Sequence, residues 1–296
     1  MIKPNIKLSV LIVSFNVCDL LRDCLDSLSI CADHISMEVI VIDNGSDDGT
    51  WQMLLDRPEI VTLRGSVDLG FSSANNLAFG HASGDYTLIL NPDTIVSVSA
   101  ISRLLNRLSE DAQIGMIGPK LILSDGSMDS SSARNIPSPL SALLHLTALP
   151  KWMPGVTIAK SYHVRDYEDN QPLEVEAISG AFMMIPTQVL RDMNGFDELF
   201  WMYGEDLDLA CRVREGGWKV VFDPSVEVEH IKRASSGQRW LKANYEFYRS
   251  MAIFYRKHLA ASKPKFMNVW VYVAIVFFGV LKMLVQCVKR IRFGVN

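Results

Sequence analysis

In the first hundred residues, two carboxylates lie at or just beyond the ends of short apolar runs. Asp43 ends one run, and Asp93 comes shortly after the run at residues 85–90. Apolar runs of this length, bounded by turn residues, are typical of buried strands, and open α/β sheets bind ligands at the carboxyl ends of their strands. The sequence therefore predicts that both carboxylates face a binding site. The alternatives are that Asp93 caps a helix starting near Val96 and that residues 43–49 form an ordinary turn.

A second acidic group stands where a stretch with helical spacing begins. Glu205, Asp206 and Asp208 are predicted to lie at the start of a helix, where the helix dipole stabilises negative charge. A carboxylate held there can act as a general base. Further along the chain, His230 ends an alternating run and is a candidate metal ligand. Alternatively, the three carboxylates are acidic residues of the sort common in the first turn of any helix, and His230 is a polar residue on the surface.

The elements that must position these side chains alternate between strands and helices. Strands are expected at residues 8–14, 38–43, 61–63, 85–90, 114–119, 175–186, 219–222 and 226–230, and helices at residues 19–28, from 51, near 72–79, at 100–108 and from 205. A strand, a crossover helix and a second strand form a right-handed βαβ unit, so an α/β domain with a mostly parallel sheet is predicted. No Gly-rich dinucleotide fingerprint follows the first strand and no P-loop motif occurs, so dinucleotide oxidoreductases and P-loop NTPases lose their main supporting signal.

Three of these segments carry more specific expectations. Ser72 or Ser73 is expected to cap a helix whose Asn75 faces away from its apolar side. Gly180 interrupts a strand-like run, where a glycine can let a ligand approach the backbone. Residues 124–174 show no clear period and are expected to form surface connections that line the substrate side.

Composition limits the class of protein and its compartment. The chain has 296 residues, of which 49% are hydrophobic, and a net charge of −4, so we expect a well-packed core and no nucleic acid partner. Its five cysteines are odd in number and lack C-x-x-C spacing, which favours reduced thiols in the cytosol. The apolar run at residues 8–13 is too short for the core of a signal peptide.

Membrane character is concentrated at the C-terminal end. Residues 239–258 have a helical pattern with an apolar face, and residues 266–281 form an apolar run with basic residues on both sides. About 16 uninterrupted apolar residues are fewer than the ~20 that cross a bilayer. A helix lying in the cytosolic leaflet and a true span therefore both stay open, and a buried helix or an oligomer interface is the third alternative.

Taken together, these motifs resemble those of family 2 glycosyltransferases with the GT-A fold, in the rhamnosyltransferase-like branch. The resemblance covers residues 8–236 and rests on the sequences VSFN at 13–16, IDNGSDDG at 42–49, DLGF at 68–71 with NN at 75–76, NPD at 91–93, GFDE at 195–198, GEDLDL at 204–209 and the histidine at 230. Asp68 replaces the usual Asn of the family, and the G-x-S that usually follows the histidine appears only loosely at residues 233–236.

The resemblance implies a fold and its divisions. The expected fold is a Rossmann-like, mostly parallel sheet flanked by helices, with a C-terminal helical appendage on the membrane. The expected boundaries are residues 1–236 for the catalytic domain, 237–263 for an amphipathic helical segment and 264–296 for an apolar helix with basic flanks.

The resemblance also implies roles for individual residues. Asp206 is the expected general base with Glu205 beside it, and Asp93 and His230 are the expected ligands of a Mg²⁺ or Mn²⁺ ion. Such an ion would stabilise a diphosphate leaving group. The residues expected to bind the donor are Ser14, Asn16, Asp43, Asn44, Gly70, Asn75, Asn91 and Gly180.

The implied activity is an inverting, metal-dependent transfer of rhamnose or another deoxyhexose from a nucleotide-diphosphate donor to a lipid-linked saccharide. The candidate donor is dTDP-rhamnose, the process is envelope polysaccharide synthesis, and the place is the cytoplasmic face of the inner membrane. One alternative is a non-catalytic, membrane-anchored module that binds a saccharide or a partner on the same fold. Another is a nucleotide-sugar pyrophosphorylase, which would need a Gly/Arg-rich loop that residues 14–17 lack.

Overall fold

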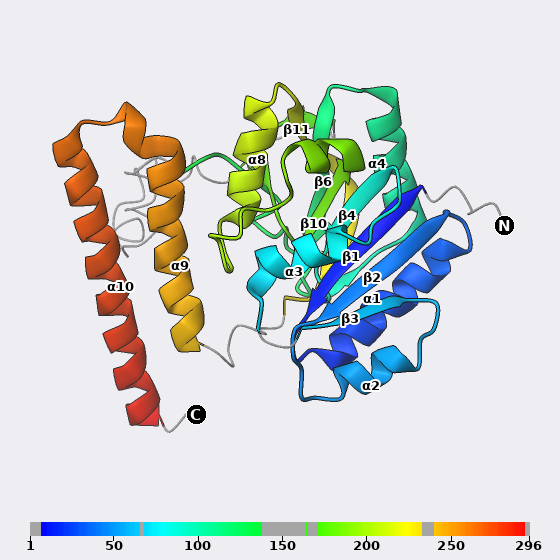
Figure 1. The fold of residues 1–296 in the computed structure, drawn as a ribbon, viewed down its shortest axis with the longest axis horizontal. Helices are drawn as coiled ribbons and strands as arrows, with labels where there is room; N and C mark the ends of the chain where they lie inside the picture. Colours follow the sequence, from blue (N-terminus) through cyan, green and yellow to red (C-terminus); the bar gives the residue numbers. More distant parts are fainter. Residues whose placement is uncertain (1–6, 66–67, 138–163, 165–170, 233–239, 294–296) are drawn as a thin grey trace. The chain divides into compact units, whose positions relative to one another are not determined.

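The computed structural model describes residues 7–65, 68–137, 164, 171–232 and 240–293 (Figure 1). These residues fall into two compact units. The sheet unit contains the described residues up to 136, from 164 to 198 and from 205 to 232, and the hairpin unit contains residues 199–204 and 240–293.

The sheet unit is built on a mixed sheet whose strands follow the order β3-β2-β1-β4-β10-β6-β11-β5, with β8 beside β11. The strands are β1 (Leu8–Ser14), β2 (Met37–Asp43), β3 (Val61–Arg64), β4 (Tyr86–Leu90), β5 (Thr94–Ile95), β6 (Ile114–Ile122), β8 (Leu173–Glu174), β10 (Phe182–Pro186) and β11 (Lys219–His230). β1, β2, β3 and β4 run parallel, β10 runs antiparallel to β4 and β6, and β11 runs parallel to β6. A separate antiparallel pair joins β7 (Ala133–Arg134) to β9 (Ala177–Ile178).

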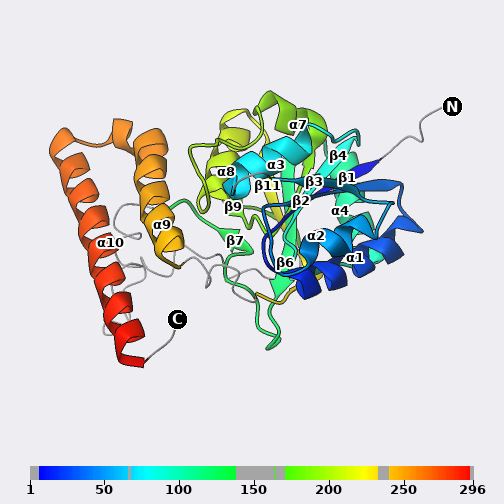
Figure 2. The same cartoon turned by 60° about the horizontal axis from the view of Figure 1, so that its bottom comes forward.

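Helices cover both faces of the sheet. They are α1 (Cys18–Ala32), α2 (Thr50–Leu55), α3 (Gly70–Phe79), α4 (Val98–Glu110), α7 (Thr187–Asp192) and α8 (Glu205–Glu215). Figure 2 shows α1, α2 and α4 on one side of the sheet and α3, α7 and α8 on the other. In β1, Val10 and Ile12 pack with the α1 and α4 side while Leu11 packs with α3. This double burial explains why the strand reads as one continuous apolar run.

The predicted α/β fold with a mostly parallel sheet is confirmed, and four local interpretations of the sequence are wrong. Ser97 caps α4 by accepting a hydrogen bond from Ala100 N at 3.2 Å, so Asp93 is not a helix cap. Ser72 and Ser73 cap nothing, because α3 already begins at Gly70.

The other two differences concern a buried amide and a long strand. Asn75 does not face away from the apolar side of α3 but is buried, and its Nδ2 donates to Phe71 O at 2.9 Å. β11 is one strand rather than two, because a register shift between Asp223 and Glu227 accommodates Pro224 within it.

The hairpin unit consists mainly of two antiparallel helices, α9 (Trp240–Phe254) and α10 (Lys265–Phe293), drawn in orange and red in Figure 1. A π-helical turn, η3 (Tyr255–Leu259), and a 3-10 turn, η4 (Ala260–Ser262), connect them. The segment Lys265–Val288 is 24 residues long, and by length and composition it could cross a membrane. It exceeds the predicted apolar run because the helix continues past Lys282.

Candidate active site

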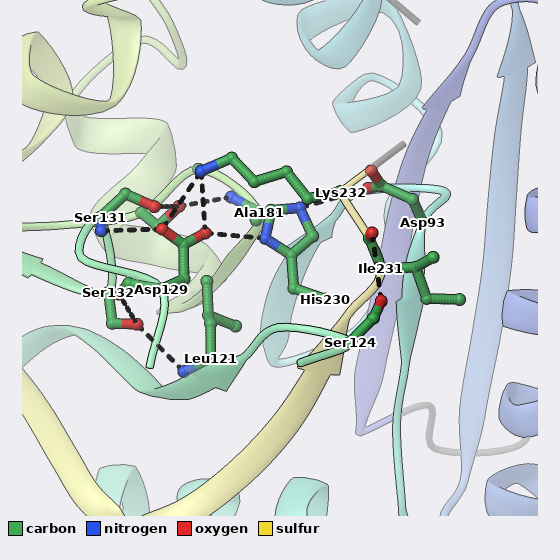
Figure 3. Close-up of polar contacts among 12 residues, drawn as sticks. Asp93, Leu121, Ser124, Asp129, Ser131, Ser132, Ala181, His230, Ile231 and Lys232 are labelled. Carbon is green, nitrogen blue, oxygen red and sulfur yellow. Dashed lines mark hydrogen bonds and ion pairs between the residues drawn. The ribbon is translucent and has the colours of Figure 1, made fainter. Parts of the chain in front are cut away.

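The ends of β4 and β11 bring Asp93 and His230 together. His230 pairs with Thr94 between β11 and β5, and Ile231 N donates to Asp93 O at 2.9 Å. These backbone contacts leave His230 Nε2 3.4 Å from Asp93 Oδ1. The other ring nitrogen, Nδ1, lies 3.0 Å from Asp129 Oδ2, so the imidazole stands between two carboxylates (Figure 3).

Asp129 is a site residue that the sequence analysis did not identify, because it lies in the stretch without a period. It is buried and accepts hydrogen bonds from Ser131 N at 2.9 Å and from Lys232 Nζ at 3.2 Å. Burial by itself raises the pKa of Asp129, but the hydrogen bonds from His230 and Ser131 and the Lys232 charge outweigh it and hold the pKa well below the usual range. Asp129 is therefore an ionised acceptor for the imidazole.

The surroundings of His230 favour its charged form in the ion-free protein. Burial lowers the pKa of the imidazole, but the hydrogen bonds to Asp129 and Asp93 and the charges of both carboxylates outweigh that effect and raise the pKa to about 9.

The donor atoms at this position fit a divalent cation. Asp93 offers a carboxylate oxygen and His230 offers Nε2, and the two atoms are close enough to bind one ion. A metal-binding histidine usually donates its second ring N–H to a carboxylate, which is what Asp129 provides. Within the described ranges, no group of three or more His, Cys, Asp or Glu side chains could hold an ion. Among the described residues, this position thus offers two donor atoms, one from Asp93 and one from His230.

Asp206 is held at the start of α8 by contacts to both of its oxygens. Oδ2 accepts hydrogen bonds from Arg134 Nη2 at 2.5 Å and from Gly180 N at 3.1 Å, and Oδ1 accepts one from Leu207 N at 2.8 Å. Arg134 is buried and also donates to Ile178 O at 2.8 Å. The sequence analysis missed Arg134 for the same reason as Asp129.

The backbone N–H of Gly180 contacts the Asp206 carboxylate, and Gly180 does not have a backbone conformation that only glycine adopts. A Cβ added there would lie 3.5 Å from Asp206 Cβ, an ordinary van der Waals distance. The approach of the Gly180 N–H to Asp206 therefore does not by itself require a glycine.

The other two carboxylates of α8 are placed differently. Glu205 is buried, its Oε2 has no hydrogen-bond partner among the described residues, and burial together with the charge of Asp206 raises its pKa to about 8. Asp208 is fully buried and pairs with Arg212 Nε at 2.8 Å. Asp206 differs from both in that its side chain is partly exposed, at 14%. Both of its oxygens accept hydrogen bonds.

One short segment, residues 179–181, joins the two acidic groups. Asn91 N, two residues before Asp93, donates to Ala181 O at 3.0 Å, and Gly180 N donates to Asp206. Ser131 Oγ donates to Ser179 Oγ at 3.4 Å. Residues 179–181 therefore connect the region of Asn91 and Asp93 with the Asp206 carboxylate, which Gly180 contacts.

The carboxyl ends of β1 and β2 present two buried polar groups without a partner. Ser14 and Asp43 are paired in register, so their side chains project from the same face of the sheet. Asp43 Oδ1 accepts from Ser46 N at 3.0 Å, whereas Asp43 Oδ2 and Ser14 Oγ make no hydrogen bond to any described residue. The closest charged group to Oδ2 is Arg64 Nε, at 3.7 Å. Unpaired buried polar atoms at a strand end are candidates for ligand contacts.

Two predicted donor-binding asparagines shape the neighbouring turns. Asn16, at a φ of 51°, accepts a hydrogen bond from Asp47 N at 2.8 Å. Asn44 Oδ1 accepts one from Leu69 N at 2.9 Å, and its Nδ2 donates to Gly70 O at 3.3 Å. Gly70 has a φ of 76°, a conformation that glycine adopts easily. Asn44 therefore fixes the entry to α3.

The chain was compared with known protein families, curated proteins and solved structures. Residues 4–244 match the model of the family described as "Glycosyltransferase like family 2". The N-acetylglucosaminyl-diphospho-decaprenol L-rhamnosyltransferase of Mycobacterium tuberculosis is 31% identical over 243 residues, 78% of each chain. Rhamnosyltransferase WbbL of Escherichia coli is 25% identical over 242 residues, 79% of this chain and 87% of that one. The solved mannosyltransferase PcManGT from Pyrobaculum calidifontis, in complex with GDP-Man and Mn²⁺, has the same fold, with a TM-score of 0.56, 14% identity and coverage of 96% and 80%.

The raised pKa of Glu205 predicts a pH-dependent gain in stability for Glu205→Gln. Between the usual carboxyl value and about pH 8, the folded protein retains a proton that the unfolded chain has lost, so the free energy of unfolding falls as pH rises. Glutamine stays neutral, so the variant should match the wild type near pH 4 and exceed it at pH 8 by an amount on the order of a few kcal/mol. Urea unfolding at both pH values measures this difference. The exposed Glu59, changed to Gln, is the control; a difference for Glu205→Gln that does not vary with pH would contradict the prediction.

Proposed function

Because the chain belongs to the glycosyltransferase-like family 2, we propose that it transfers rhamnose or another deoxyhexose from a nucleotide diphosphate to a lipid-linked saccharide, with inversion. Membership in the family makes the chain a glycosyltransferase, and the proposal concerns its donor, acceptor and mechanism. The observation that carries it is the placement of His230 between Asp93 and the buried Asp129 at the end of β4. A nucleotide-diphosphate donor needs a cation at such a strand end, because its leaving group departs with negative charge.

Asp93 and His230 are proposed to hold the cation. A bound Mg²⁺ or Mn²⁺ would neutralise charge that develops on the departing diphosphate. Asp129 accepts a hydrogen bond from the Nδ1–H and so keeps Nε2 directed at Asp93. The presence of Mn²⁺ in the solved mannosyltransferase of the same fold supports the use of a divalent cation.

Asp43 is proposed to recognise the base of the donor. Its Oδ2 is a buried acceptor that makes no hydrogen bond to any described residue, with the Arg64 charge 3.7 Å away, and thymine and uracil carry a ring N–H that can donate to it. The adjacent Ser14 and the turn held by Asn16 would complete the nucleoside site. A dTDP donor fits this chemistry, and rhamnose as the transferred sugar is supported by the names of the two rhamnosyltransferase relatives.

The remaining donor contacts are proposed for the residues that border these groups. Asn44 would hold Gly70 in place beside the donor. Asn75 would contact the donor through Oδ1, a buried acceptor that makes no hydrogen bond to any described residue. Asn91 and Gly180 lie beside the two carboxylate groups and would contact the diphosphate or the sugar.

Asp206 is proposed to remove the proton from the acceptor hydroxyl. An alcohol becomes an effective nucleophile only when a positioned base takes its proton as it attacks. Arg134 and the Gly180 N–H both bind Oδ2, so they orient the carboxylate and leave a lone pair of Oδ1 available. Direct attack by the hydroxyl on the anomeric carbon, with departure of the nucleoside diphosphate, inverts that centre.

The acceptor is proposed to be a saccharide on a polyprenyl diphosphate at the cytoplasmic face of the inner membrane. The name of the relative at 31% identity specifies N-acetylglucosaminyl-diphospho-decaprenol as its acceptor. The apolar α10 supports a membrane location for the present chain. The test of the whole proposal is to incubate purified protein with dTDP-rhamnose, UDP-sugars or GDP-sugars, a synthetic lipid-linked N-acetylglucosamine, and Mg²⁺ or Mn²⁺. Transfer from dTDP-rhamnose is expected; transfer only from another donor would change the sugar assignment.

Asp93→Ala should abolish transfer and the cation-dependent part of donor binding while the protein remains folded. A carboxylate at a strand end adds little to the core, so circular dichroism should be unchanged. Calorimetric titration of the donor with and without Mn²⁺ measures the effect, and Asp47→Ala, at an exposed site in a donor-side turn, is the control. Full activity of the wild type in EDTA would contradict the assignment.

Asp129→Asn should weaken the affinity for the cation by about 10–100-fold, because an amide is a poorer acceptor for the imidazole N–H. The cation concentration that gives half-maximal turnover measures this change. Saturating cation should restore most of the turnover, which distinguishes a positioning residue from a ligand. If cation affinity were unchanged, Asp129 would have only a packing role.

Asp206→Asn should lower turnover by about 10²–10⁴-fold with donor affinity nearly unchanged, because the amide keeps the shape but cannot accept the proton. Glu205→Gln should cost less, since Glu205 is already neutral near pH 7. Measuring kcat and the donor Kd for both variants checks the assignment. Near-normal turnover of Asp206→Asn together with loss in Glu205→Gln would move the role of base to Glu205.

A further inference from the structure

The two faces of α10 differ in character. The polar side chains within its apolar span are turned toward α9 and the connecting turns: Asn268 accepts from Tyr255 Oη (2.6 Å), Gln286 accepts from Asn244 Nδ2 (2.7 Å), and Lys282 Nζ lies over the Phe247 ring (5.3 Å). Gly279 lies against Tyr248, where an added Cβ would meet the ring at 3.1 Å. The side of α10 that faces α9 is therefore both the polar side and the closely packed one.

The opposite side of α10 is an apolar stripe. Its large residues are each 44–70% exposed and are Phe266, Val269, Trp270, Val273, Val276, Phe277, Val280, Leu281, Leu284, Val285 and Val288. At 100° per residue, these positions occupy about half of the helix circumference, and Asn268, Lys282 and Gln286 lie on the other half. The stripe is roughly 33 Å long at 1.5 Å per residue. An exposed apolar surface of this length calls for a partner.

The charge of the hairpin unit identifies the partner. Residues 240–293 contain ten Lys and Arg residues and one acidic residue, Glu246, whereas the rest of the chain contains 19 basic and 32 acidic residues. A basic, apolar helical surface is suited to an anionic lipid bilayer, because the apolar residues enter the acyl region and the basic residues attract the head groups. A second copy of the hairpin unit would bring two such positive charges together.

The position of α9 indicates whether α10 lies in the plane of the membrane or crosses it. The contacts of Asn244 with Gln286 and of Tyr248 with Gly279 place the N-terminal half of α9 beside residues 279–286 of α10. That half of α9 carries Lys242 and Glu246, and Arg249 follows less than one turn later. If α10 crossed the bilayer, these charges would be carried into the hydrocarbon region, where charged side chains are strongly disfavoured.

We propose that the hairpin unit binds an anionic bilayer with α10 lying in the plane of one leaflet, the apolar stripe among the acyl chains and α9 on the water side. The inference rests on the proposed function in one respect, since a lipid-linked acceptor requires the enzyme to work at a membrane. It adds how the chain binds that membrane: from one side, without crossing it. Lys282, which interrupts the apolar run in the sequence, lies against α9 and does not interrupt the lipid-facing stripe.

The first experiment measures binding of the full chain to vesicles without sugar or cation. Vesicles of phosphatidylcholine with about one third phosphatidylglycerol should bind the protein at least about tenfold more tightly than phosphatidylcholine alone. Val276→Glu, in the middle of the stripe, should weaken binding by about tenfold or more. Leu55→Glu is the matched control, because it places the same charge on an exposed apolar position of α2, with 54% exposure against 64% for Val276. It should bind like the wild type.

The second experiment distinguishes an in-plane helix from a spanning one. Single cysteines at positions 266, 276 and 288, in a chain with Cys18→Ser and Cys287→Ser, carry a fluorophore, and lipids brominated at known depths quench it. An in-plane helix gives similar, shallow depths at all three positions. A deep position 276 between shallow ends would mean that α10 spans the bilayer and would overturn the proposal.

Two other results would also overturn the proposal. One is equal binding to anionic vesicles by the wild type and Val276→Glu. The other is a wild-type dimer that Val276→Glu converts to a monomer without any vesicle binding, because the stripe would then cover a second copy. Neither result bears on the glycosyltransferase assignment, since transfer to a water-soluble acceptor analogue is measured separately with Mn²⁺ present.

Discussion

The hydrogen bond between Asp129 and His230 is the constraint on which the proposed cation site depends. Asp129 is buried and ionised, and it accepts a hydrogen bond from the Nδ1–H of the imidazole. With one nitrogen fixed in this way, the other can only face Asp93. The sheet order supplies the remaining constraint, because β11 pairs with β5 directly after Asp93. The turn that carries Asp129 and the last strand of the sheet thus together orient one ring nitrogen.

The start of α8 shows how three similar carboxylates acquire different properties from their surroundings. Burial leaves Glu205 neutral near pH 7, Arg212 neutralises the enclosed Asp208, and Arg134 orients Asp206 at a partly exposed position. Helix geometry alone separates their directions, but these neighbours give each carboxylate a different set of contacts. The assignment of a base to this motif therefore rests on residues outside the motif.

The sequence predicted well what depends on local pattern. Strand ends placed Asp43 and Asp93 correctly, because a buried strand reads as an apolar run that stops at its carboxyl end. The sequence did not predict features that depend on hydrogen bonds formed in the folded protein. Asn75 is buried despite its polarity, since its amide bonds to the backbone of its own helix. Asp129 and Arg134 could not be found, because their roles come from partners about 70 to 100 residues away in a stretch without a period.

The place of β11 in the sheet also sets an order of events during synthesis. β11 lies between β6 and β5 and ends at His230, so the sheet cannot close until almost the whole sheet unit has left the ribosome. The strands that form the proposed nucleoside site are complete far earlier, by residue 43. α10 begins only at Lys265, after the final strand. All strands of the sheet thus emerge from the ribosome before the apolar stripe does.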